Sequence, residues 1–222
     1  GLEAYEHALQ RRPGWAEARS NAGLALLGLG RLEEAVACQQ QVVAESPQYG
    51  PGWTNLGGVL QRLGRLDEAV AAFERAAELQ PDDVLVLSNL AQAMDEGGGC
   101  GLVTHRRAVA ADPGNAVAHY NLAVALVADG QTAAARDAFV RTAELDPAMA
   151  EPWLGLGNLM QLGEHHAEAV AAYAEALVRR PDWPEALSNA GVAAARLDRL
   201  EEAEVLCRRA VECRPDYADG WT

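Results

Sequence analysis

The 222-residue sequence predicts an all-α protein, a right-handed superhelical solenoid of antiparallel helix pairs. Three observations predict this fold: prolines recur at a fixed period, small residues recur in phase with them, and each period holds two amphipathic helical segments. The prolines stand 34 residues apart except for one step of 32, and they are Pro13, Pro47, Pro81, Pro113, Pro147, Pro181 and Pro215. A fixed period of about 20 to 50 residues is typical of a repeat array.

The first helix of a period is clearest in the second one. Trp53, Leu56 and Leu60 recur at three- or four-residue spacing, which places them on one apolar face of a helix. Gly64 and Arg65 then interrupt the pattern, so a turn is expected there.

A second helix is expected to follow this turn. Asp67 and Glu68 stand at its start, where carboxylates suit the positive end of the helix dipole. Phe73 and Leu79 belong to its apolar face. Pro81 ends it, because the residue before a proline avoids helical geometry.

Small residues explain how the two helices of a pair approach each other. Gly57 on the first helix and Ala69 on the second leave room for close packing. A large residue at either place would overpack the contact and lower the stability of the fold by about 1–3 kcal/mol. The same two columns hold Gly23, Gly157 and Gly191 on first helices, with Ala91 and Ala123 substituting, and Ala35, Ala135, Ala169 and Ala203 on second helices.

Two motifs and a closing proline carry a family resemblance: Trp53-x-x-Leu56-Gly57-x-x-Leu60, then Ala69-x-x-x-Phe73-x-x-Ala76, then Pro81. This pattern resembles the tetratricopeptide repeat (TPR) family, and its phased matches cover essentially the whole chain. The resemblance implies six full repeats, at 16–49, 50–83, 84–115, 116–149, 150–183 and 184–217. Residues 1–15 are expected to form the second helix of a truncated repeat, and residues 218–222 the start of another. Since a half-repeat cannot bury its own face, the chain is expected to be a piece of a longer protein.

The repeat at 84–115 is irregular, because it lacks two residues and has a glycine-rich turn from Gly97 to Gly101. Glycine in a helix interior costs about 1 kcal/mol relative to alanine. One interpretation is a decayed repeat with a shortened second helix. The other is a hinge that lets the two three-repeat halves flex.

Composition excludes several functions. The net charge is −14, and all 18 basic residues are Arg, so a catalytic or phosphate-loop lysine is absent. Nucleic-acid binding is not expected, because it depends on basic charge. No stretch approaches the roughly 20 apolar residues of a membrane span, so no membrane insertion and a cytoplasmic location are expected. The Arg- and Ala-rich, Lys-free composition suggests a GC-rich bacterial gene.

No catalytic residue, metal ligand or cofactor is expected in this segment. His165 and His166 are adjacent and point to different sides of a helix or turn, so they do not form an i, i+4 metal pair. Cys207 and Cys213 are six residues apart, which matches no zinc spacing. Solvated helix starts account for the paired carboxylates. The segment is therefore predicted not to be an enzyme, and the activity of a parent protein stays open.

A column of asparagines is the main candidate site. Asn21, Asn55, Asn89, Asn121 and Asn189 hold one position of the first helix, and where the fifth repeat has Gly155, Asn158 follows three residues later. A side-chain amide both donates and accepts, so it can pair with a peptide backbone regardless of the peptide's sequence. The alternative is that asparagine is simply usual at this position of the family pattern.

Positions beside the column complete the expected peptide-binding groove. Positive charge is expected from Arg62 and Arg196. Apolar contact is expected from Leu24, Leu85, Tyr120, Val124, Val127, Leu154 and Val192. Negative charge is expected from Glu17, Asp95, Glu96, Glu151 and Glu185. Some TPR domains hold a C-terminal carboxylate with a lysine- and arginine-rich clamp, and this chain lacks the matching basic set. With a net charge of −14, a neutral to basic extended peptide is the expected partner.

The sequence therefore predicts a protein–protein interaction scaffold that binds an extended peptide segment in its concave groove. The alternative is a substrate-recruiting arm of a larger enzyme, because the asparagine column is similar to that of the TPR arm of O-linked N-acetylglucosamine transferases. Bacterial TPR-fused glycosyltransferases and sulfotransferases carry comparable arrays. A third, weaker possibility is self-association through uncapped end helices.

Overall fold

The structure is a computed structural model that describes residues 2–12 and 14–214 of the chain. Helices and the turns between them make up these ranges, which contain no strand, so the predicted all-α class is confirmed. The expected start of a further repeat at 218–222 lies outside the described residues. No helix in the described part of the chain is long and apolar enough to cross a membrane.

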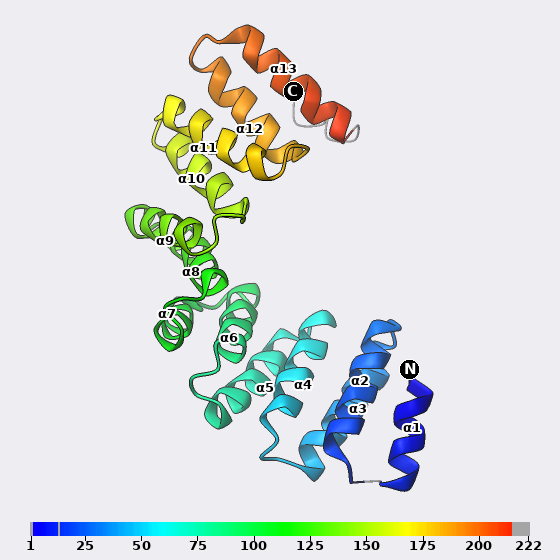
Figure 1. Cartoon of the computed structure of the whole chain (residues 1–222). Helices are drawn as coiled ribbons and strands as arrows, with labels where there is room; N and C mark the ends of the chain where they lie inside the picture. Colours follow the sequence, from blue (N-terminus) through cyan, green and yellow to red (C-terminus); the bar gives the residue numbers. More distant parts are fainter. Residues whose placement is uncertain (1, 13, 215–222) are drawn as a thin grey trace. The chain divides into compact units, whose positions relative to one another are not determined.

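The chain forms two compact units, Gly1–Pro113 and Gly114–Thr222, and each is considered by itself. In the first unit, consecutive helices pack as antiparallel pairs, and each pair also contacts the next (Figure 1). Its helices are α1 (Leu2–Arg11), α2 (Ala16–Gly28), α3 (Leu32–Glu45), α4 (Gly50–Arg62), α5 (Leu66–Leu79), α6 (Val84–Glu96) and α7 (Leu102–Ala111).

The second unit repeats this arrangement with three helix pairs (Figure 1). Within each pair the two helices are joined by a short turn. The helices are α8 (Ala116–Ala128), α9 (Thr132–Leu145), α10 (Glu151–Leu162), α11 (His166–Arg179), α12 (Pro184–Ala195) and α13 (Leu200–Cys213).

Close helix–helix packing depends on the small residues, as expected. A Cβ placed on Gly57 would lie only 2.7 Å from the ring of Phe73 on the partner helix, and Ala69 is completely buried between the two helices. Gly157 faces Tyr173 in the same way. The glycine thus makes room for the large residue on the second helix, whose ring then fills the core.

The irregular repeat has the shortened second helix that one interpretation predicts, because α7 has 10 residues where α3 and α5 have 14. The turn before it is held by hydrogen bonds. Asp95 accepts from the Gly101 backbone N–H (2.6 Å), and its other oxygen lies 2.9 Å from Nε2 of the buried His105. Gly98 adopts a left-handed conformation (φ +77°) in the turn.

The glycine run lies inside the first unit, and the division between the units falls later, at Pro113–Gly114. At Gly101 the helices approach so closely that a Cβ would collide with the backbone carbonyl of Ala91. This close packing and the Asp95 contacts favour the shortened-helix interpretation. Flexing at residues 97–101 stays a prediction.

Candidate functional site

The asparagines of the predicted column all lie on first helices. In the first unit Asn21, Asn55 and Asn89 belong to α2, α4 and α6, and each is half-buried. The first helices α2 and α4, and likewise α4 and α6, contact each other directly. The column therefore lies where successive helix pairs meet.

Asn55 forms a hydrogen bond to the preceding helix pair. Its Nδ2 donates to the Ser20 hydroxyl of α2 (2.8 Å), and that hydroxyl donates to Oε1 of Gln39 (3.1 Å). Gln39 is completely buried, and its Nε2 donates to the Ser20 carbonyl (2.9 Å). A buried amide is stable only when its groups are paired, so this network satisfies a polar core residue and links two repeats.

A second link of this kind joins α10 and α12 in the second unit. Nδ2 of Asn189 donates to Oδ1 of Asn158 (3.0 Å). The Tyr173 hydroxyl lies 2.8 Å from both Oδ1 of Asn158 and Oε1 of Gln161, and it donates its proton to one of them. Asn158 therefore links this repeat to its neighbour through an asparagine amide, as Asn55 does in the first unit.

The other three asparagines of the predicted column are not tied in this way. Asn21, Asn89 and Asn121 make no side-chain hydrogen bond to any residue that the structure describes. Their amides keep both donor and acceptor capacity for an external group. The column thus divides into bonded members and open ones.

A hollow of about 460 Å³ opens between α8 and α10 in the second unit. It brings together three of the predicted site residues, Tyr120, Val124 and Asn158. It is completed by side chains from α8 to α12 and the loop before α12, which are Val127, Phe139, Glu151, Leu154, Leu159, Trp183 and Glu185. Asn121 and Asn189 do not line it.

One aromatic ring that lines the hollow packs against the next helix pair. In the column of small residues α2, α4, α10 and α12 have glycine, whereas α6 and α8 have Ala91 and Ala123, which are completely buried. The Phe139 ring lies against Gly155 of the following pair, where a Cβ would be only 2.5 Å from the ring. An asparagine side chain would therefore not fit at Gly155, where the asparagine column is interrupted.

Two carboxylates influence the tyrosines of this region. Burial raises the pKa of the Tyr120 hydroxyl, and the negative charges of Glu151 and Glu185 raise it further. Burial also raises the pKa of Tyr173 strongly, with Glu185 adding to it and the hydrogen bond with Asn189 opposing it. The charge of Glu185 therefore also influences Tyr173, which does not line the hollow.

The two predicted arginines lie elsewhere. Arg62 is exposed at the end of α4, in the first unit. Arg196 lines a separate hollow of about 700 Å³ between α12 and α13, together with Val192 and Cys207. The structure thus does not bring Arg196 to the hollow that holds Tyr120.

Sequence reasoning missed Phe139 and Trp183 as lining residues. Phe139 belongs to the column of large core residues, and its ring lies against Gly155 and lines the hollow. Trp183 directly precedes a first helix, in phase with Trp15 and Tyr49. This second aromatic column is the signal that could have found Trp183.

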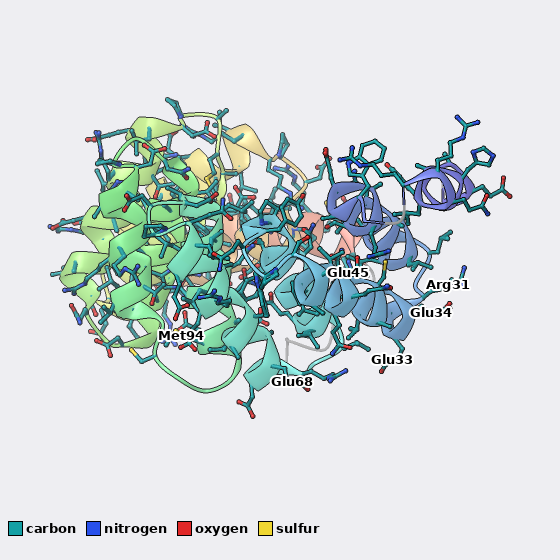
Figure 2. All side chains as sticks on the ribbon, turned by 90° about the horizontal axis from the view of Figure 1, so that it is seen from below. Arg31, Glu33, Glu34, Glu45, Glu68 and Met94 are labelled. Carbon is teal, nitrogen blue, oxygen red and sulfur yellow. The ribbon has the colours of Figure 1, made fainter. Side chains whose placement is uncertain are left out.

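The acidic pairs at the starts of second helices are exposed and paired with arginine. Arg31 donates to both carboxylate oxygens of Glu34 at 2.7 Å, and Arg65 does the same to Glu68. Arg31, Glu33 and Glu34 project together from the beginning of α3 (Figure 2). These contacts lower the pKa of Glu34 and Glu68, so both carboxylates are ionised surface groups.

Among the described residues, no group of three or more His, Cys, Asp or Glu side chains is arranged to hold a metal ion. The four cysteines, Cys38, Cys100, Cys207 and Cys213, are not joined in disulfides. Burial raises the pKa of the Cys38 and Cys207 thiols, which opposes formation of the nucleophilic thiolate.

Comparison with known proteins finds curated relatives that are much longer than this chain. The TPR repeat-containing thioredoxin TTL4 of Arabidopsis thaliana is 44% identical over 62 residues, which is 28% of this chain and 9% of that protein. The cytochrome c-type biogenesis protein CycH of Rhizobium meliloti (strain 1021) is 34% identical over 143 residues, which is 62% of this chain and 36% of CycH. The chain therefore spans about a third or less of these relatives.

A solved structure shares the fold. The crystal structure of YrrB, described as a TPR protein with an unusual peptide-binding site, superimposes with a TM-score of 0.67 at 21% sequence identity. The match covers 84% of this chain and 97% of YrrB. At this identity the likeness concerns the fold alone.

Family models of the tetratricopeptide repeat match residues 1–50, 51–83, 106–137 and 158–218, which is most of the chain. The matched segments fall in both units and include helices of each. The resemblance drawn from the sequence motifs is thus confirmed, and the chain belongs to the tetratricopeptide repeat family.

Proposed function

We propose that the chain is a protein-interaction scaffold that binds an extended segment of a partner protein along the exposed faces of its first helices. The observation that carries this proposal is the hollow between α8 and α10, which collects Tyr120, Val124 and Asn158 on one surface. Concave sites with apolar walls and a few polar groups are the usual binding sites of proteins. YrrB, which shares the fold, is described as having a peptide-binding site.

Binding would combine apolar anchors with amide contacts. Val124 and Val127 are 47% and 42% exposed at the hollow and can cover an apolar side chain. The open amide of Asn121 on the same helix can pair with a peptide's backbone N–H and C=O groups. In the first unit Leu24 is exposed, and Asn21 has an open amide. Each unit thus supports contact with an extended chain by itself.

Selection from a random 12-residue peptide library on the whole chain tests this proposal. Peptides retained by the wild-type protein are counted again on Val124→Arg, which places a bulky cation at the hollow. Val140→Arg is the matched control, because Val140 is 42% exposed on α9 and does not line the hollow. We expect enrichment on the wild type and on the control, and loss on Val124→Arg. Equal enrichment on all three proteins would contradict a site at this hollow.

A substrate-recruiting arm of a larger enzyme is the second candidate. One observation favours it: a relative named as a thioredoxin contains a TPR segment that is 44% identical to part of this chain. The resemblance of the asparagine column to O-linked N-acetylglucosamine transferases points the same way. Sequencing of the parent gene beyond both ends of the chain tests this candidate. A neighbouring transferase or sulfotransferase domain would support it, and a gene that encodes only further repeats would contradict it.

Self-association through the end helices stays a prediction for this chain. Light scattering over a hundredfold range of protein concentration measures it directly. A mass that rises with concentration would support self-association, and a constant monomer mass would contradict it.

A further inference from the structure

The hollow in the second unit has apolar walls and acidic groups at its edge. Val124 and Leu154 form parts of the wall. Glu151 and Glu185 come from the first turns of α10 and α12, and both line the hollow. None of the residues that line it is an arginine or lysine. Two acidic side chains thus face an apolar hollow without a cation among its lining residues.

The two carboxylates act on the same space. After burial, their charges are the causes that raise the pKa of the Tyr120 hydroxyl, so both lie close enough to influence one ring. Neither Glu151 nor Glu185 forms an ion pair with a residue in the described ranges. Arg180 stacks on the Trp183 ring, 4.8 Å from its centroid, but does not itself line the hollow.

These features suit one kind of side chain. A long aliphatic stem can lie on Val124 and Leu154, as lysine and arginine stems do on apolar surfaces. The charged head can then reach the carboxylates of Glu151 and Glu185 in charge-assisted hydrogen bonds. An acidic side chain would be repelled. A purely apolar one would cover the carboxylates without pairing them, which is unfavourable.

We infer that the hollow between α8 and α10 selects a basic side chain, arginine or lysine, from the partner segment. This inference rests on the proposed function, because it names the chemistry of the residue that the groove recognises. The carboxylates of Glu151 and Glu185 hold the cation, and the apolar wall holds the stem. Affinity from this contact falls as salt concentration rises, because exposed charge pairs are screened.

The test uses the whole chain and the peptide selection described above. The five most enriched peptides are synthesised, and each is also made with every Arg or Lys replaced singly by norleucine, which keeps an aliphatic stem and removes the charge. Binding is measured by fluorescence anisotropy at 50 mM and 500 mM salt. Glu151→Gln/Glu185→Gln is compared with Glu168→Gln/Glu201→Gln, which removes the same charge from exposed second-helix starts of the same unit.

We expect one basic position per peptide whose replacement weakens binding by about tenfold at low salt, the size of charge-assisted contacts with two carboxylates. The Glu151→Gln/Glu185→Gln protein should show the same loss with the unmodified peptide and no further loss with norleucine. The control pair should bind as the wild type does.

Three results would overturn the inference, and they differ in what they leave standing. Peptides that lose binding to Val124→Arg but bind equally well with norleucine would remove the basic side chain and keep the groove as a binding site. Absence of any peptide that distinguishes Val124→Arg from Val140→Arg would remove both the inference and the proposed function. Loss of binding in both glutamine proteins alike would show a nonspecific effect of net charge and would overturn the inference alone.

Discussion

The helix pairs α2–α3 of the first unit and α8–α9 of the second unit fill the same core position with different side chains, one polar and one aromatic. In α3 the position belongs to Gln39, a completely buried amide that is bonded twice to Ser20. In α9 it belongs to Phe139, whose ring makes no hydrogen bond and lies 5.9 Å from the ring of Tyr120. Both pairs keep the tetratricopeptide geometry.

The difference changes what contacts the neighbouring repeat. Gln39 accepts from the Ser20 hydroxyl, which itself accepts from Asn55 of the next repeat, so the amide of Asn55 is bonded within the protein. The ring of Phe139 instead lies against Gly155 of the next repeat and lines the hollow. The same core position thus supports a polar link between repeats in one unit and an apolar hollow in the other.

The largest effect is expected where the packing common to both units is broken. Gly57→Leu places a side chain where even a Cβ would lie 2.7 Å from Phe73, so we expect a loss of about 3 kcal/mol in the free energy of unfolding, measured by urea denaturation. The control is Gly58→Ala on the same helix, which has open space at its Cβ position. It should stabilise by about 0.5–1 kcal/mol, because alanine favours helix over glycine. Equal behaviour of the two variants would contradict the packing role of the glycine.

The next effect concerns the hollow itself. Gly155→Asn restores the asparagine column but collides with the Phe139 ring, so we expect a destabilisation of about 2 kcal/mol. Combining it with Phe139→Leu, which removes part of the ring, should recover stability relative to the sum of the single changes. A double-mutant cycle by urea denaturation measures this coupling. Strictly additive effects would show that the two positions do not constrain each other.

A smaller effect separates the bonded asparagines from the open ones. Asn55→Ala removes the hydrogen bond to Ser20, so we expect a loss of about 1 kcal/mol in the free energy of unfolding. Asn121→Ala and Asn89→Ala break no bond to a described residue, and alanine favours helix, so they should be neutral or stabilising by about 0.5 kcal/mol. Peptide capture should weaken in the Asn121 variant. Unchanged capture would mean that the column reflects family pattern only.

The smallest effect is expected at the exposed helix starts. The hydrogen bonds from Arg65 hold the pKa of Glu68 below its ordinary value of 4.5. The contribution of this ion pair to the stability of the fold is therefore present above pH 4.5 and is lost as the pH falls through the lowered pKa of Glu68. Because exposed pairs contribute little, Glu68→Gln should leave the midpoint of thermal unfolding at pH 7 almost unchanged. A large decrease would assign the pair a structural role that its exposure does not suggest.

The helix pairs and the family could be predicted from the sequence because they depend on local spacing. The period of the prolines and the phase of Gly57 and Ala69 are visible without any contact between distant residues. Tyr120, Val124 and Asn158 could be placed on one surface by the same periodicity, and the structure does bring them to one hollow.

The rest could not be predicted because it depends on contacts between neighbouring repeats. The sequence shows that Gly155 replaces an asparagine, but not that Phe139 of the preceding pair occupies the space. The sequence shows Asn55 in the column, but not that its amide donates a hydrogen bond to the Ser20 hydroxyl. Likewise, the repeat length shows that two residues are missing, but not that His105 contacts Asp95 there.

The contact between Phe139 and Gly155 also limits how this array can be rearranged. Repeat proteins are often treated as strings of interchangeable modules, since each unit meets only its neighbours. Here a ring from one module occupies a place that only glycine in the next can leave empty. A module with asparagine at that place, if spliced behind α9, would meet the ring directly. A graft of the α8–α9 pair therefore needs a following module with glycine at that place.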